Sequence, residues 1–314
     1  MKVYKFGGAS IKDYKSIKRL ARIIRKHNHD EMILIVSAMG KTTNSMEDFV
    51  LSYTKSFKNL KNKLELIKSF HKDIVKDLFQ KNQQSVLKII ESVFNEIDKF
   101  LKLNKENDYN FIYDQLVSYG EILSSVIISE YLNSIGLKSK WVDARSCIKT
   151  DQYYRDANVD FEKTSKSIKR KIKGKGLFIS QGFIGSNKKS FTTTLGREGS
   201  DYSAAIFAHA LNAESVTIWK DVRGVLNADP RYFNKTKLLN KISYEEAIEL
   251  AFYGASVIHP KTLQPLKKKK IPLYVKSFLS PSREGTVISK KDHKVKDIPS
   301  HIVKWNRVLL KISS

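Results

Sequence analysis

The sequence predicts an α/β protein whose central sheet is mostly parallel and is covered by helices on both faces. Short apolar runs typical of buried parallel strands alternate along the chain with amphipathic helical patterns. Residues 44–105 have helical periodicity and no strand pattern, which predicts a helical hairpin that projects from the sheet. The chain has 314 residues, 41% of them hydrophobic, which is enough for one two-lobed unit with a packed core.

The first half of the chain opens with a strand, helix, strand unit. In its helix, Ile17, Leu20 and Ile24 share one face. A later long helix ends at Gly136, a residue type favoured just past a helix C-terminus. The predicted elements are a strand at 1–6, a helix at about 13–28, a strand at 31–38, two hairpin helices separated by the polar stretch 80–85, and a helix at 112–135.

The second half resumes the alternation of strands and helices. No internal repeat is evident, and no linker rich in Pro, Gly or Ser separates two domains. We expect the role of the chain to change near residue 180, with one lobe before it and one after it. The predicted elements are strands at 138–143, 176–185, 215–222 and 271–278, and helices at 200–211 and 243–254.

The net charge of +25 raises the question of a nucleic-acid partner. The lysines are dispersed, with local clusters only at 169–175 and 267–270, and no groove-reading or base-stacking motif accompanies them. A solvated basic surface that attracts anionic substrates is the better interpretation, so we expect no nucleic-acid partner.

Apolar runs in the chain are too short for a membrane span, and the N-terminus lacks the pattern of a signal peptide. The sequence therefore predicts no membrane association and a cytoplasmic location. The single cysteine, Cys147, has no partner cysteine for a disulfide or a zinc site, so packing is its expected role.

The opening stretch "MKVYKFGGAS" places Lys5 at the end of a strand and two glycines directly after it. Gly7 and Gly8 remove two side chains at a turn, so backbone N–H groups there could approach an anion closely. The alternative is an ordinary glycine turn before a capped helix.

The stretch "TTTLGREGSDYSAA" combines a flexible glycine turn with the start of a helix. Ser200 is the predicted cap, Asp201 lies in the first turn, and Arg197 supplies a forked cation for a carboxylate or phosphate. Asp201 could instead simply favour the helix dipole.

The stretch "WKDVRGVLNADPR" follows a predicted strand, at the position where loops of an α/β sheet line a ligand crevice. An ordinary polar connection is the alternative. The chain has no P-loop motif, no dinucleotide-binding fingerprint, no nucleophile elbow and no metal-ligand spacing among its histidines. Lysine, glycine turns and an Arg/Asp helix start together suggest phosphoryl transfer to an anionic acceptor.

Six motifs in order resemble those of aspartate kinases, within the amino-acid kinase superfamily. They are "KFGGAS", "VSAMGKTTN", "SYGEILSS", "TLGREGSD", "WKDVRGVLNADPR" and "YGASVIHPKTLQPL". The resemblance implies a three-layer amino-acid kinase fold and transfer of the γ-phosphoryl of MgATP to the β-carboxylate of L-aspartate. The product, 4-phospho-L-aspartate, begins lysine, threonine and methionine synthesis.

Carried over by position, the resemblance implies that Lys5 neutralises the transferring phosphoryl group and that Asp201 orients Lys5 and the reacting groups. Arg197 would bind the α-carboxylate of aspartate and Glu121 its ammonium, although Glu121 alone could equally be a surface acid. Further aspartate contacts would come from Ser37, Thr43 and Ser200. The nucleotide would contact Lys5, Phe6, Gly7, Gly8, Lys220, Asp221, Leu226, Arg231 and Ser256. No residue is assigned to a metal.

Four positions depart from the family pattern: Ala9 replaces Thr, Glu198 replaces Gly, Leu226 replaces a frequent Tyr, and Ser256 replaces a frequent Lys. A carboxylate at 198 would repel aspartate unless it points away or pairs with a cation. Lys261 follows Ser256 by about one and a half helical turns.

The resemblance implies a catalytic domain at 1–298, with an aspartate-binding lobe at about 1–180 and an ATP-binding lobe at about 181–298. Residues 299–314 would be the remnant or the start of a regulatory region, and "WNRVLLKISS" resembles its first strand. We therefore expect no feedback inhibition by lysine or threonine. A homodimer is also an expectation.

Three alternatives remain open at this stage. Another amino-acid kinase could act on glutamate, N-acetylglutamate, carbamate or UMP, but the helical hairpin and the Arg197/Glu121 pair favour a free α-amino acid. A decayed homologue could only bind a partner subunit, but Lys5, Arg197 and Asp201 are intact. A basic nucleic-acid binder would show salt-dependent binding to mixed DNA or RNA.

Overall fold

The structure is a computed structural model that describes residues 1–314 except 28, 56–58, 254–257, 291–297 and 304–314. The predicted strand at the C-terminal end and the candidate residue Ser256 lie outside the described residues. None of the helices in the described ranges is long and apolar enough to cross a bilayer.

An eight-stranded sheet forms the centre of the molecule, with strand order β3-β4-β2-β1-β7-β9-β10-β8. Neighbouring strands are parallel except β9 and β10, which pair antiparallel. The strands are β1 (Lys2–Phe6), β2 (Glu31–Val36), β3 (Ser139–Val142), β4 (Gly176–Gln181), β7 (Ser215–Lys220), β8 (Lys241–Ser243), β9 (Leu273–Ser277) and β10 (Thr286–Ser289). A separate antiparallel pair consists of β5 (Ile184–Ser186) and β6 (Thr192–Thr194).

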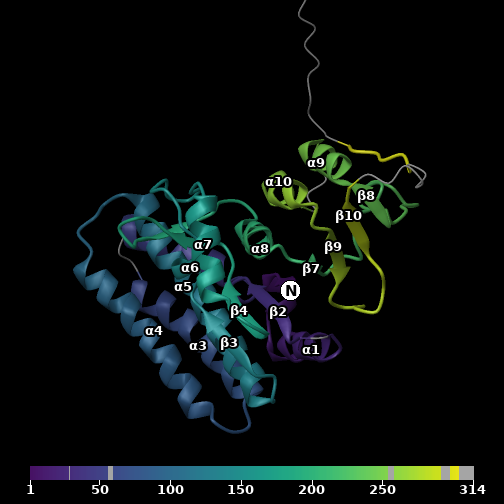
Figure 1. The fold of residues 1–314 in the computed structure, drawn as a ribbon. Coiled ribbons are helices and arrows are strands. Elements are labelled where there is room, and N and C mark those ends of the chain that lie inside the picture. The colour runs from purple at the N-terminus through teal and green to yellow at the C-terminus, as the bar shows by residue number, and fades with distance from the viewer. Residues whose placement is uncertain (28, 56–58, 254–257, 291–297, 304–314) are drawn as a thin grey trace, which may run out of the picture.

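Helices cover both faces of this sheet, as predicted (Figure 1). The first half contributes α1 (Tyr14–Arg25), α2 (Thr42–Lys55), α3 (Leu60–Leu78), α4 (Gln83–Leu103), α5 (Tyr109–Ser134) and α6 (Ala144–Cys147). The second half contributes α7 (Phe161–Lys171), α8 (Gly199–Leu211), α9 (Tyr244–Tyr253) and α10 (Pro260–Lys269). A short 3-10 helix, Gly8–Ile11, follows β1.

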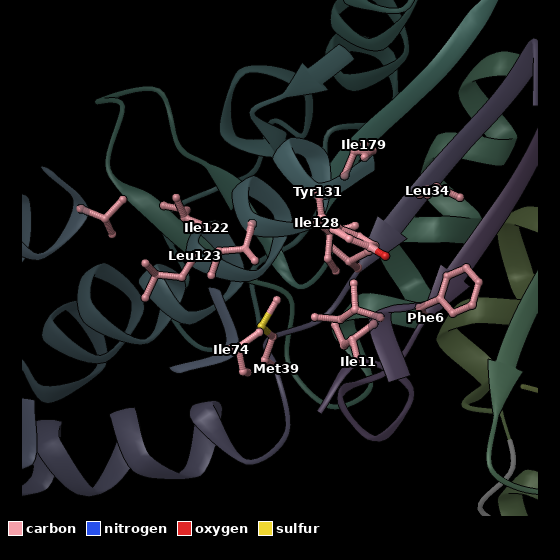
Figure 2. Packing of buried hydrophobic residues seen from close by; sticks show 14 of the residues in the cluster. Phe6, Ile11, Leu34, Met39, Ile74, Ile122, Leu123, Ile128, Tyr131 and Ile179 are labelled. Atoms are coloured by element: carbon pink, nitrogen blue, oxygen red, sulfur yellow. The ribbon is translucent and has the colours of Figure 1, made fainter. Parts of the chain in front are cut away.

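Alternate residues of the central strands point to opposite faces of the sheet, which divides the core in two. On one face Tyr4, Leu34 and Ile179 pack with α1 and α5 and with the α3–α4 hairpin. Figure 2 shows this packing, with Ile74 of α3 beside Met39 and Ile128 of α5 beside Tyr131. On the other face, alternating strand residues such as Val3, Ile33 and Phe178 pack with α7, α8, α9 and α10. The sandwiched sheet confirms the predicted three-layer α/β class.

The predicted helical hairpin is confirmed as α3 and α4, which lie along the flank of the molecule at the left of Figure 1. Residues 42–55 form a separate helix, α2, ahead of the hairpin. The predicted single strand at 176–185 is wrong, because the chain leaves β4 at Gly182 and Phe183 before β5 begins. Phe183 has a positive φ of 71°, which a continuous strand does not allow.

Candidate active site

Parallel pairing brings three chain segments to one edge of the sheet. Phe6 of β1 pairs in register with Val36 of β2 and with Trp219 of β7. The carboxyl ends of these strands therefore meet, and the residues just beyond or at them, Ser37 and Lys220, lie near Lys5. This is the edge at which open α/β sheets bind ligands.

A cavity of about 280 Å³, here called the smaller cavity, opens at this edge. It contains six of the residues predicted for catalysis and aspartate binding. These are Lys5, Ser37, Thr43, Glu121, Ser200 and Asp201, and the rest of the lining is Phe183, Gly196, Glu198, Gly199 and Lys220. Arg197 is exposed and does not line the cavity, although Gly196 and Glu198 on either side of it do.

Asp201 lies at the bottom of a charge cluster with two lysines. Its Oδ1 is 2.5 Å from Lys5 Nζ, and its Oδ2 is 3.5 Å from Lys220 Nζ. Burial alone would raise the pKa of Asp201, but the charges of Lys5 and Lys220 and their hydrogen bonds together hold it below its usual value. The carboxylate stays ionised, and the three groups carry one net positive charge into the cavity.

The glycine turn after β1 is required by close packing. A Cβ at Gly8 would lie 2.7 Å from the carbonyl oxygen of Gly40 and 2.9 Å from that of Ala38, because this turn touches the loop after β2. A Cβ at Gly7 would lie 3.3 Å from Lys5 Nζ. The glycines therefore let two loops approach and leave the Lys5 ammonium uncrowded, but neither glycine lines the smaller cavity.

Glu121 is the second buried acid of the smaller cavity besides Asp201, with 3% of its surface exposed. It lies within α5 next to Gly120, whose missing side chain lets α5 pack closely on Thr42 of α2. Within the described residues its Oε2 has no hydrogen-bond partner. Burial raises the pKa of Glu121 to about 8, against the opposing effects of the Ala38 N–H and of Lys5. The alternative that Glu121 is a surface acid is wrong.

The helix after "TLGREG" begins one residue earlier than predicted, and its N-cap is Glu198 rather than Ser200. Glu198 has a positive φ of 52°, a conformation that glycine adopts more easily. Its Oε2 accepts a hydrogen bond from the backbone N–H of His259, 3.1 Å away at the start of α10. This contact holds one carboxylate oxygen against the start of α10, although Glu198 still lines the smaller cavity.

Phe183 is a lining residue that the sequence analysis missed. Its ring packs on the start of α8, since a Cβ at Gly199 would lie 2.6 Å from Phe183 Cδ2. The neighbouring Gly182 is required there too, because a Cβ would meet Ser200 at 2.5 Å. The two glycines of "SQGFIG" could have indicated a turn at Gly182 and Phe183, but the apolar residues around them predict a continuous strand.

Two polar residues of α5 hold the strand that leads to α8, and the sequence analysis missed them as well. Asp114 accepts hydrogen bonds from Thr194 N at 2.8 Å and from Thr194 Oγ1 at 2.7 Å. Gln115 donates to the carbonyl of Thr192 at 2.8 Å and accepts from its N–H at 3.1 Å. Burial raises the pKa of Asp114 to about 6, and these hydrogen bonds oppose the rise. Both are positioning residues.

A second cavity of about 970 Å³, here called the larger cavity, lies beyond the end of β7. Three of the predicted nucleotide residues line it, Asp221, Leu226 and Arg231, while Lys220 lines the smaller cavity. Arg231 is held by Asp229, which it contacts at 2.6 to 3.0 Å.

Two other residues considered for the nucleotide lie away from the larger cavity. Phe6 is fully buried and stacks on Trp219 with ring centroids 5.9 Å apart, so its side chain belongs to the core. Lys261 does not line the larger cavity, because its ammonium pairs with Asp156 at 2.6 Å. In the described ranges, no group of three or more His, Cys, Asp or Glu side chains is arranged to bind a metal ion.

Comparison with known proteins decides the family. The model of the amino acid kinase family matches residues 1–277. The chain belongs to the amino acid kinase family. Lysine-sensitive aspartokinase 3 of Escherichia coli is 32% identical, over 99% of this chain and 69% of that protein. The bifunctional aspartokinase/homoserine dehydrogenase 2 of Arabidopsis thaliana is 30% identical, over 91% of this chain.

The solved structures agree with this family assignment. The crystal structure of E. coli aspartokinase III in complex with aspartate and ADP has a TM-score of 0.81 and 31% identity, over 94% of this chain and 65% of that one. This chain spans only 32% of the length of the Arabidopsis bifunctional protein. The resemblance to aspartate kinases that the six motifs indicate is thereby confirmed. This chain covers about two thirds of the length of the E. coli protein.

Proposed function

We propose that this amino acid kinase transfers the γ-phosphoryl group of MgATP to the β-carboxylate of L-aspartate, giving 4-phospho-L-aspartate for lysine, threonine and methionine synthesis. One observation carries the proposal. The smaller cavity places a buried acid, Glu121, whose Oε2 has no hydrogen-bond partner among the described residues, in the same space as the ammonium groups of Lys5 and Lys220. An α-amino acid with an acidic side chain needs both, one for its ammonium and one for its anionic end.

Aspartate would lie in the smaller cavity with its ammonium on Glu121. The hydroxyls of Ser37, Thr43 and Ser200 would donate hydrogen bonds to its oxygens, since all three line the same space. Arg197, exposed at the rim, would bind the α-carboxylate after its side chain turns inward.

The transferring phosphoryl group would lie against Lys5. A carboxylate acceptor is already a nucleophile, so no general base is needed, and catalysis rests on positioning and charge stabilisation. Asp201 holds Lys5 from a buried position, which keeps the ammonium in place before the substrates arrive.

The nucleotide would occupy the larger cavity, which Asp221 lines, while the adjacent Lys220 lines the smaller cavity. Contacts would come from Leu226 and Arg231, and from the backbone of Phe6, Gly7 and Gly8, with Ser256 kept as a prediction. Mg²⁺ is bound in such sites mainly through substrate phosphates and water, which fits a chain whose described residues offer no carboxylate cluster. When bound, the ion would neutralise phosphate charge.

We also propose that residues 1–298 form the catalytic domain, with an aspartate-binding lobe at about 1–180 and an ATP-binding lobe at about 181–298. The smaller cavity takes Glu121 from the first lobe and Ser200 from the second, so the two substrates would meet between them. Residues 299–314 as a regulatory remnant, the homodimer and the cytoplasmic location remain predictions.

The function is tested with purified protein, MgATP, L-aspartate and hydroxylamine, which traps an acyl phosphate as a hydroxamate. We expect hydroxamate only when aspartate is present, and none with succinate, which has both carboxylates but no ammonium for Glu121. Absence of aspartate-dependent hydroxamate would refute the assignment, and a product formed from glutamate instead would favour another member of the family.

Glu121→Gln tests the role of the buried acid. Because the pKa of Glu121 is about 8, the carboxylate fraction increases as pH rises, and the KM for aspartate of the unmodified enzyme should fall from pH 6.5 to pH 8. The fall should be about 15-fold if only the carboxylate binds the ammonium. The variant should show a KM raised by about 30-fold or more at pH 8 and little dependence on pH.

Thermal unfolding provides the control for the same variant. A folded-state pKa raised above the unfolded value means that the folded protein binds more protons between about pH 4.5 and 8, so stability falls as pH rises through that window. Glu121→Gln lacks this contribution and should be at least as stable as the unmodified protein at pH 8. A KM profile that keeps its pH dependence in the variant would contradict the role of Glu121.

A further inference from the structure

A third cavity, separate from the two above, lies between the first turns of α7 and the turn that joins β5 to β6. We call it the α7 cavity. It has a volume of about 400 Å³ and shares no lining residue with the smaller or the larger cavity. Its charged lining consists of one carboxylate, Asp160, and four lysines, Lys149, Lys163, Lys166 and Lys188. The cavity is therefore strongly positive.

Carboxylates neutralise only two of the four lysines. Lys163 pairs with Asp160 at 2.6 Å and Lys166 with Glu162 at 2.6 Å. Lys149 and Lys188 form no ion pair with a carboxylate in the part of the chain that the structure describes. Two ammonium groups thus face a concave, polar space without a counter-ion.

Lys149 is held in place by its surroundings. Its Nζ donates to the carbonyl of Arg145 at 2.8 Å and to Ser186 Oγ at 3.1 Å, and an ammonium has a third donor to offer. Burial lowers the pKa of Lys149, and the charges of Arg170 and Lys171 act in the same direction. A half-buried cation with an unused donor is stabilised by an anion that completes its contacts.

We propose that the α7 cavity binds a small phosphate-type anion. Lysines from both walls would neutralise it, Lys163 and Lys166 from α7 and Lys188 from the turn, with Lys149 at the floor. The hydroxyl of Ser167 and the side-chain amide of Asn187 add neutral donors. The volume suits an anion from pyrophosphate to a small phosphorylated metabolite.

The occupant would touch the segment that leads to the candidate active site. Asn187 Oδ1 accepts hydrogen bonds from Lys189 N and Phe191 N, which shapes the turn ahead of β6. Thr150, a lining residue, bonds through its hydroxyl to that of Thr193 in β6 at 2.7 Å. Binding should therefore protect the backbone amides of residues 187–194 from hydrogen exchange.

The test follows hydrogen exchange at 187–194 while pyrophosphate is titrated into the full chain at low salt. The unmodified protein should show saturable protection. A triple variant, Lys163→Gln, Lys166→Gln and Lys188→Gln, removes three exposed cations of the cavity. It should raise the half-saturating concentration by about 10-fold or more, because charge-assisted contacts are lost. The triple variant leaves the lining of the candidate active site intact, so only the protection that this variant weakens reports on the α7 cavity.

A matched control, Lys81→Gln, Lys88→Gln and Lys102→Gln, removes three exposed lysines that line none of the three cavities. It lowers the net charge equally and should change the half-saturating concentration by about 2-fold or less. If both triple variants raised the half-saturating concentration equally, the binding would reflect only the general positive charge of the surface, and the proposal would be overturned. No protection up to about 10 mM pyrophosphate would also overturn the proposal.

Discussion

Lys5→Ala is expected to lower kcat at least about 100-fold, with a change in the KM for aspartate of no more than about 3-fold. The ammonium of Lys5 lines the smaller cavity and is the nearest cation to the buried Asp201. Charge that develops on the transferring phosphoryl group would lose this stabilisation, and a 100-fold loss corresponds to about 2.7 kcal/mol of activation free energy. Steady-state kinetics with saturating MgATP provide the measurement.

Lys2→Ala is the matched control, since Lys2 begins the same strand and pairs with Glu214 at 3.6 Å on the surface. It should leave both constants within about 2-fold. Lys220 remains near Asp201 in the Lys5 variant, so the buried carboxylate keeps a counter-charge and the chain should fold. If the Lys5 variant lost affinity for aspartate and kept kcat, Lys5 would be a substrate-binding residue and its catalytic role would be rejected.

The central strands β1, β2 and β4 could be predicted from sequence because each is a short, mostly apolar run that is buried beyond its first residue. The strand "EMILIV" has one exposed residue at its start and five buried ones after it. Helices α7 and α10 were missed for the opposite reason. Only Thr164 and Ile168 of α7 are buried, and α10 begins at Pro260, contains Pro265 and ends in lysines. A lysine-rich segment with so few buried residues has no clear apolar periodicity, so its sequence pattern resembles that of a solvent-exposed loop.

In the candidate site, too, some residues could be predicted from the sequence and others could not. Lys5, Glu121 and Asp201 lie in motifs, so a resemblance to known proteins could single them out. Phe183, Asp114 and Gln115 contribute through contacts between segments far apart in the chain, such as Asp114 with Thr194. Local patterns do not encode such contacts. Arg197 shows the limit for a motif residue, because its sequence position predicts a role while its side chain lies exposed outside the cavity.

Asp201→Asn is the second variant for which we expect a large effect, a fall in kcat of about 100-fold or more. Asparagine has nearly the same volume, so the change removes a charge and leaves the packing of α8 in place. Lys5 and Lys220 then lose their shared counter-ion, and their repulsion displaces both ammonium groups from the cavity. The low pKa of Asp201 in the folded chain also means that its carboxylate contributes stability at neutral pH, which is lost as pH falls.

A double-mutant cycle with Lys5→Ala separates positioning from independent catalysis. If Asp201 acts by holding Lys5, the kcat of the double variant should lie within about 3-fold of the kcat of the slower single variant. If the two losses multiply to about 10⁴-fold, each residue acts on its own, and the positioning role of Asp201 fails. The exposed pair of Lys2, which begins the same strand as Lys5, and Glu214, which precedes β7, supplies the parallel cycle and should show no coupling in kcat. Coupling confined to the buried pair would assign Asp201 the task of holding the phosphoryl-binding lysine in place.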